Sequence, residues 1–209
     1  MPISLPTIYP ITDRAVSGLS HTEQVKCLIE GGATFIQLRD KNGAPKSFLQ
    51  DAEAAIIVAR QNDVRIVIND RVDVAMALGA DGVHLGQSDI PVDAARRLLG
   101  ADAIIGFSTH TISQVEVAAT LAVDYVAFGP VFDTRTKRDH EPLVGLEHLR
   151  EVKRVLADTT LVAIGGISAV NFRSALVAGA DSVAVISDLL KEPNKISEKL
   201  KRMLTASSG

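Results

Sequence analysis

The chain has 209 residues, of which 46% are hydrophobic and 22% charged, and its formal net charge is −3. This composition excludes wholesale disorder, because it supplies enough apolar side chains for a sizeable core. The slightly acidic balance argues against nucleic acid as a partner, since nucleic-acid binders usually present a strongly basic face. The single cysteine, Cys27, excludes an intramolecular disulfide and a cysteine-based zinc cluster, and it suits a reducing cytoplasm.

Neither a membrane span nor an export signal is predicted. The longest stretch without Asp, Glu, Lys or Arg covers residues 159–172, which is shorter than the roughly 20 residues that a spanning helix needs. Residues 1–6 contain no basic n-region and no apolar h-region. We therefore expect a cytoplasmic protein without membrane contact, and we expect residues 205–209 to form a frayed tail.

Short β-branched runs alternate with amphipathic helical patterns along the chain. The first predicted helix begins with the capping box Ser20-x-x-Glu23, and the second begins near Pro45, a residue at home in a first helical turn. Between the strands, apolar residues recur at a spacing near 3.6, which is typical of helices that bury one face. The predicted strands are residues 7–13, 33–40, 64–70, 82–87, 103–110, 124–132, 160–166 and 182–187.

Eight strands that alternate with eight helices favour parallel pairing with right-handed crossovers. We predict that residues 1–209 form one α/β domain, a single-domain (β/α)8 TIM barrel. A doubly wound open sheet is the alternative, but it usually needs fewer strands, and no Gly-x-Gly-x-x-Gly follows the first strand. A short repeat supports the barrel, because similar tripeptides precede every second strand, at residues 32–34, 79–81, 122–124 and 179–181.

Polar residues gather where the predicted strands end, which in such a barrel is the face that holds the active site. Gln37, Arg39 and Lys41 share one parity, so a strand projects all three side chains in the same direction. Inward-facing cations are costly unless they meet an anion. We therefore favour an anion site, with salt bridges from these cations to Asp70 or Asp89 as the alternative.

Asp70 and Asp89 end two neighbouring strands. Two carboxylates beside cations suit a partly hydrated Mg²⁺ that also binds phosphate oxygens. Alternatively, either Asp could cap the helix that follows it, and Pro91 supports this role for Asp89. Together with Asn69 and the two cations, the carboxylates predict a metal–diphosphate site.

Two later segments suggest a second anion site. Residues 133–144 form a long loop, which is typical of a lid, and residues 134–137 combine threonine hydroxyls with a lysine, as a phosphate site would. A solvated charged surface is the alternative for this loop. Gly165-Gly166 and Ile186-Ser187 close the last two strands, where backbone N–H groups can approach an anion; a tight turn that requires glycine is the alternative. Two anion sites indicate two phosphorylated substrates.

Taken together, these motifs resemble the thiamine phosphate synthase family. The resemblance extends from residue 9 to residue 187, nearly the whole chain, with the segments in the expected order. The matching segments are residues 9–13, 36–41, 68–70, 82–89, 106–110, 124–132, 134–137, 163–167 and 183–187.

The resemblance implies a transferase that moves a hydroxymethylpyrimidine group from its diphosphate to the ring nitrogen of a thiazole phosphate. It implies one Mg²⁺ per subunit, held by Asp70 and Asp89. The residues implied for the pyrimidine diphosphate are Gln37, Leu38, Arg39, Asp40, Lys41, Asn69, Ser108 and Lys137. The residues implied for the thiazole phosphate are Thr134, Arg135, Thr136, Gly166, Ile186 and Ser187.

The implied chemistry agrees with the residues present. The aminopyrimidine can stabilise a methylene cation, and the thiazole nitrogen has no proton to lose, so the reaction needs no general base. What requires stabilisation is the charge that develops on the leaving diphosphate. We expect the catalytic residues to be Arg39, Lys41, Lys137 and Ser108.

Two other functions are alternatives to this transferase. A thiazole tautomerase of the same superfamily would transfer protons, but such relatives tend to carry His where this chain has Pro130. A non-catalytic ligand-binding barrel is the second alternative, and the Asp70/Asp89 pair argues against it. We expect small phosphorylated molecules as partners, and the sequence is compatible with a homo-oligomer.

Overall fold

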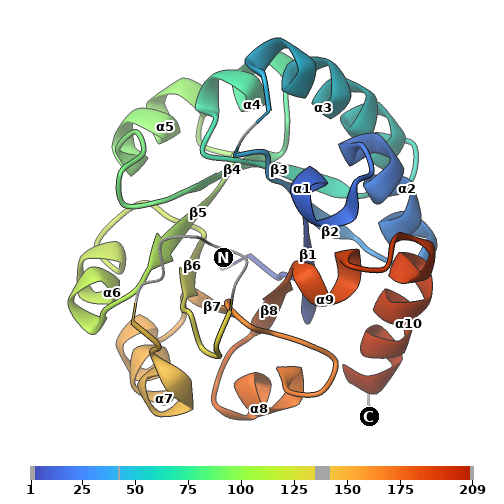
Figure 1. The fold of residues 1–209 in the computed structure, drawn as a ribbon. Coiled ribbons are helices and arrows are strands. Elements are labelled where there is room, and N and C mark those ends of the chain that lie inside the picture. The colour runs from blue at the N-terminus through green and yellow to red at the C-terminus, as the bar shows by residue number, and fades with distance from the viewer. Residues whose placement is uncertain (1–2, 42, 135–141, 208–209) are drawn as a thin grey trace.

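The computed structural model describes residues 3–41, 43–134 and 142–207. Eight parallel strands close into a barrel in chain order, and β8 pairs with β1 to complete the ring (Figure 1). The predicted (β/α)8 barrel is confirmed. The strands are β1 Ile8–Thr12, β2 Phe35–Leu38, β3 Arg65–Asn69, β4 Gly82–Leu85, β5 Ile104–Thr109, β6 Tyr125–Phe128, β7 Thr160–Ala163 and β8 Ser182–Val185.

A ring of helices surrounds the barrel. In the described part of the chain these are α2 His21–Glu30, α3 Pro45–Arg60, α4 Val72–Leu78, α5 Val92–Leu99, α6 Ile112–Ala118, α7 Gly145–Leu156, α8 Phe172–Val177 and α10 Ile196–Ser207. Additional short elements are α1 Arg14–Ser17, α9 Ser187–Leu190 and the 3-10 helix η1 Pro193–Lys195. Helices α1 and α9 lie side by side (Figure 1). No described helix is long and apolar enough to cross a membrane.

Local sequence signals explain where two of the helices begin. The Ser20 side chain accepts from the Glu23 backbone N–H, and Glu23 accepts from the Ser20 backbone N–H, which completes the predicted capping box of α2. Pro45 occupies the first turn of α3, as predicted. The frayed tail expected at residues 205–209 is wrong for residues 205–207, because α10 continues to Ser207 and Arg173 donates to the carbonyl oxygen of Ala206.

The core consists of two layers, because successive residues of a strand face opposite sides of the sheet. The outer layer packs the strands against the helices. The inner layer fills the barrel, as expected for a barrel whose interior is a packed core. The buried apolar residues of the inner layer are Tyr9, Ile11, Phe35, Val67, Ile104, Tyr125, Ala127, Val162 and Ala184.

The short sequence repeat has a structural role at the amino-terminal rim. Asp81, Asp124 and Asp181 each accept a hydrogen bond from a backbone N–H of the preceding strand, at 2.6, 2.8 and 2.8 Å. Arg96 and Lys153 pair with the second and third of these carboxylates. The recurring Asp therefore joins three of the even-numbered strands, β4, β6 and β8, to the strand before each of them, at the end of the barrel opposite to the predicted site.

Gly82 allows strands β4 and β5 to approach each other. A Cβ atom at this position would lie 1.9 Å from the carbonyl oxygen of Ile104, and both residues belong to the same parallel ladder. We expect Gly82→Ala to lower the free energy of unfolding by more than about 3 kcal/mol, because backbone must move. Chemical denaturation measures this change.

Gly18→Ala is the matched control. Nothing lies within 4 Å of a Cβ at Gly18, whose φ is +74° in the left-handed region. This variant should lose only about 1 to 2 kcal/mol, the cost of this conformation for an L-residue. Equal losses in the two variants would contradict the steric explanation.

Candidate active site

A cavity of about 1430 Å³ opens at the carboxyl-terminal ends of the strands. Residues at or just after the end of every strand line it, as the fold predicts. The cavity collects most of the predicted site residues that the structure describes. These are Gln37, Arg39, Lys41, Asn69, Asp70, Asp89, Ser108, Thr134, Gly166, Ile186 and Ser187.

Five predicted residues are not among the described residues that line the cavity. The Leu38 side chain is fully buried in the outer layer, and Asp40 accepts from the Gly43 backbone N–H at 2.6 Å, so neither side chain lines the cavity. Strand alternation explains this, because the odd-numbered neighbours face inward. A ligand in the cavity could meet Leu38 and Asp40 only through their backbone. Arg135, Thr136 and Lys137, with most of the predicted lid, lie outside the described residues.

Arg39 and Lys41 both face the cavity, and each is paired with a carboxylate. Lys41 Nζ lies 2.5 Å from Asp70 Oδ2, which is one of the salt bridges considered as an alternative. Arg39 pairs instead with Asp13, which also accepts from the Ala15 backbone N–H at 2.9 Å as the N-cap of α1. Because a guanidinium has five N–H donors and an ammonium three, both cations keep donors for an anion.

Asp70 and Asp89 come together at one side of the cavity. Asp89 Oδ2 accepts from the Gly86 backbone N–H at 2.6 Å. Burial raises the pKa of Asp89, and the neighbouring Asp70 carboxylate raises this pKa further. Neither Asp caps the following helix, because the N-caps of α4 and α5 are Arg71 and Pro91. The capping alternative is therefore wrong for both carboxylates.

The backbone of Asp70 is unusual. Its φ is 61°, in the left-handed region that residues other than glycine rarely adopt. This conformation costs on the order of 1 kcal/mol. The carboxylate of Asp70 lies next to both Lys41 and Asp89. The strained backbone therefore belongs to a residue whose side chain is held at the cavity.

The two carboxylates fit a divalent cation of the magnesium type. Mg²⁺ prefers hard oxygen ligands and commonly keeps several waters, with one or two carboxylates and a substrate phosphate completing its shell. In the part of the chain that the structure describes, no group of three or more His, Cys, Asp or Glu side chains could hold a metal. Asp70 and Asp89 could supply the two carboxylates of such a shell.

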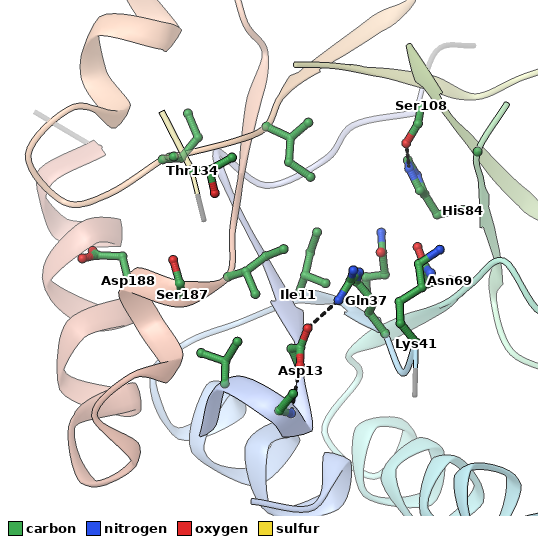
Figure 2. Close-up of a pocket in the computed structure, with 18 of the residues that line it drawn as sticks. Ile11, Asp13, Gln37, Lys41, Asn69, His84, Ser108, Thr134, Ser187 and Asp188 are labelled. Atoms are coloured by element: carbon green, nitrogen blue, oxygen red, sulfur yellow. Dashed lines mark hydrogen bonds and ion pairs between the residues drawn. The ribbon is translucent and has the colours of Figure 1, made fainter. Parts of the chain in front are cut away.

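Figure 2 shows the labelled polar side chains other than Asp13 in two groups on opposite sides of the cavity. One group consists of Thr134, in the loop after β6, and of Ser187 and Asp188, which begin α9 after β8. The other group comes from β2 to β5 and the segments that follow them, and it consists of Gln37, Lys41, Asn69, His84 and Ser108. The geometry thus has two polar walls, as the prediction of two anion sites requires.

Gly166 lies on the first of these walls. Its φ is +64°, and a Cβ there would lie 2.4 Å from the carbonyl oxygen of Asp133 and 2.7 Å from that of Phe132. The close approach of the β6–α7 loop therefore requires glycine at this position. The tight-turn alternative holds for Gly166, and the turn also lines the cavity.

Sequence reasoning missed several lining residues. Asp13 directly follows the first strand, and His84 alternates with the outward-facing Val83 and Leu85, so strand position and parity were the available signals. His84 Nε2 lies 2.8 Å from Ser108 Oγ. Other polar lining residues without a predicted role include Gln87, His110, Gln114, Asp188, Lys191, Glu192 and Lys199.

The fold and the cavity define a class of protein. A parallel barrel with cations and paired carboxylates at its carboxyl rim is suited to phosphorylated ligands. Residues 8–189 match the family described as thiamine monophosphate synthase. The chain belongs to this family.

Individual relatives agree with the family match. The chain is 40% identical over 207 residues to the thiamine-phosphate synthase of Koribacter versatilis (strain Ellin345), with 97% of each chain covered. It is 43% identical over 202 residues to that of Albidiferax ferrireducens, with 95% and 92% covered. The solved structure of a thiamine phosphate pyrophosphorylase from Pyrococcus furiosus matches with a TM-score of 0.86 at 32% identity, covering 97% of both chains.

The raised pKa of Asp89 predicts a pH dependence of stability. The folded chain binds this proton more tightly than the unfolded chain, so the free energy of unfolding should fall as pH rises from about 4 through the raised pKa. Asp89→Asn removes this contribution and retains an acceptor for the Gly86 N–H. We expect wild-type stability minus that of Asp89→Asn to decrease across this interval, as measured by urea denaturation at a series of pH values. A difference that grows with pH would contradict the prediction.

Proposed function

We propose that this protein is a thiamine phosphate synthase. It would transfer the hydroxymethylpyrimidine group from its diphosphate to the ring nitrogen of a thiazole phosphate, with release of diphosphate. The observation that carries the proposal is a cavity at the carboxyl rim with polar side chains on two opposite walls, and we infer that each wall binds one phosphorylated ligand. Membership of the family and the names of the curated relatives support it.

The leaving diphosphate is assigned to the wall with the cations. Arg39 and Lys41 donate to diphosphate oxygens, and Asn69 and Ser108 add uncharged donors. Lys137 is assigned to the same group by the family resemblance. Asp70 and Asp89 would hold Mg²⁺, which when bound supplies a Lewis acid for the developing negative charge. These groups lower the barrier because they are oriented before the charge appears.

The thiazole phosphate is assigned to the opposite wall. Gly166 and Ser187 line the cavity after β7 and β8, with Thr134 and Ile186 beside them, and their backbone N–H groups would donate to the phosphate. Arg135 and Thr136 are assigned here by the resemblance alone.

The bond changes balance without proton transfer. The bond from methylene carbon to diphosphate oxygen breaks, and its electron pair leaves with the diphosphate. The lone pair of the thiazole nitrogen then forms the new carbon–nitrogen bond. Tautomerase relatives tend to carry His where this chain carries Pro130, whose side chain cannot transfer a proton. The single cysteine, which is free, suits a reducing compartment, so we place the reaction in the cytoplasm.

Turnover with both phosphorylated substrates tests the proposal. We expect the purified protein to form thiamine phosphate and diphosphate with Mg²⁺ and to lose this activity in a chelator. Asp70→Ala and Asp89→Ala should each reduce kcat by about 100-fold or more, which corresponds to several kcal/mol of barrier. Asp73→Ala is the control, because Asp73 lies on α4 and pairs with Arg71 outside the cavity. Absence of turnover by the wild type would favour the non-catalytic barrel.

A second experiment separates the two walls. Gly166→Ala displaces the β6–α7 loop and so changes the part of the cavity assigned to the thiazole phosphate. We expect KM for the thiazole phosphate to rise by about tenfold or more, with less than about a threefold rise for the pyrimidine diphosphate. Gly145→Ala is the control, since its φ is also positive, at +71°, and nothing lies within 4 Å of its Cβ. Equal rises in both KM values would mean that the walls are assigned wrongly.

A further inference from the structure

A continuous chain of hydrogen bonds crosses the barrel interior from β2 to β5, between two residues that line the cavity. Gln37 Nε2 donates to the Tyr9 hydroxyl at 2.7 Å, and the hydroxyls of Tyr9 and Tyr125 lie 2.8 Å apart. The Tyr125 hydroxyl lies 3.0 Å from His84 Nδ1, and His84 Nε2 lies 2.8 Å from Ser108 Oγ. Tyr9 and Tyr125 are fully enclosed, whereas Gln37, His84 and Ser108 reach the cavity.

Within this chain of hydrogen bonds, the direction of one bond determines the direction of the next. Each tyrosine hydroxyl has a single proton to donate. Burial raises the pKa of Tyr9 and of Tyr125 well above the ordinary value, so both keep that proton. Because the Gln37 amide donates to Tyr9, both hydroxyl protons find an acceptor within these bonds only when the Tyr9 proton goes to Tyr125 and the Tyr125 proton goes to His84 Nδ1. The neutral imidazole then carries its own proton on Nε2 and donates it to Ser108.

The last link sets the direction of the Ser108 hydroxyl. When Ser108 Oγ accepts from His84, its own proton is left to point toward the cavity. We propose that Tyr9 and Tyr125 are positioning residues that hold His84 in the Nε2–H tautomer and thereby make Ser108 a hydrogen-bond donor to the leaving diphosphate. The identity of that anion rests on the proposed function, whereas the tautomer does not.

The packing around the chain of hydrogen bonds supports a single arrangement. The His84 and Tyr125 rings are stacked, with centroids 5.5 Å apart, and the Tyr9 ring meets Tyr125 edge-on at 5.9 Å. A Cβ at Gly106 of β5 would lie 2.4 Å from the Tyr125 hydroxyl oxygen and 2.5 Å from His84 Nδ1. Any larger residue at position 106 would therefore separate the tyrosine from the histidine. Glycine leaves room for this one hydrogen bond.

A preset donor has a defined energetic role. An oriented hydroxyl stabilises charge as it develops without reorganising at that moment. The opposite polarity, with the Gln37 amide turned over and Nδ1 protonated, would give the Ser108 proton to His84 and present an oxygen lone pair to the anion. The two polarities place the imidazole proton on different nitrogens, so they can be distinguished by measurement.

Nitrogen NMR of the full-length protein, labelled with ¹⁵N-histidine, tests the tautomer without substrate. We expect His84 to show an unprotonated Nδ1 and a protonated Nε2, with its signals assigned by their loss in His84→Gln. A protonated Nδ1, alone or together with a protonated Nε2, would overturn the inference. This outcome does not depend on which reaction the protein catalyses.

Tyr125→Phe tests the effect on turnover. We expect a mixture of both His84 tautomers, a roughly tenfold fall in kcat for diphosphate release, and a KM for the pyrimidine diphosphate within about twofold of wild type. Phe35→Leu is the packing control, because Phe35 lies 4.9 Å from the Tyr9 ring and has no side-chain hydrogen bond to lose. It should retain the wild-type tautomer and kcat.

Tyr9→Phe provides a second variant. It leaves Tyr125 in contact with His84 but removes the hydroxyl that directs the Tyr125 proton, so it should also give mixed tautomers and a lower kcat. Wild-type tautomer and kcat in either folded tyrosine variant would overturn the inference. A wild-type protein that forms no thiamine phosphate would instead defeat the proposed function and leave the tautomer result standing.

Discussion

Parallel closure of the barrel is the constraint on which the site depends. Because all eight strands run in one direction, their carboxyl ends meet at a single rim, and the polar residues that follow them cannot avoid one another. The chain accommodates this crowding by pairing opposite charges, Arg39 with Asp13 and Lys41 with Asp70. Such pairing fixes the position of each cation at the wall of the cavity and leaves further N–H groups directed elsewhere. The ion pairs therefore hold both cations where the proposed function requires them.

Carboxylates have opposite roles at the two ends of the barrel. At the amino-terminal rim, Asp81, Asp124 and Asp181 each accept from a backbone N–H of a neighbouring strand, and two of them also pair with a cation. At the carboxyl rim, Asp70 and Asp89 face each other, which is unfavourable for two negative charges and raises the pKa of Asp89. The carboxylates of the first rim join strands, whereas those of the second rim are held close together at the wall of the cavity.

Sequence patterns were informative wherever a single strand determined the geometry. Alternation and strand order predicted the barrel, and parity placed Gln37, Arg39 and Lys41 on the cavity side. A contiguous family motif was less reliable for Leu38 and Asp40, since a strand sends alternate residues to the other face. The bond between the Tyr9 and Tyr125 hydroxyls joins residues 116 positions apart, and both resemble ordinary core aromatics in the sequence. Helices α1 and α9 are four residues each, too short for a helical period to be seen.

The left-handed backbone of Asp70 determines which substitutions the backbone tolerates at this position. Glycine adopts a φ of 61° without penalty, so Asp70→Gly would relieve the local conformation and remove a carboxylate that faces Asp89. The same replacement would remove the ion pair with Lys41 and would take one of the two carboxylates proposed for Mg²⁺. A relative with glycine at this position would therefore be expected to keep the barrel without the proposed metal site.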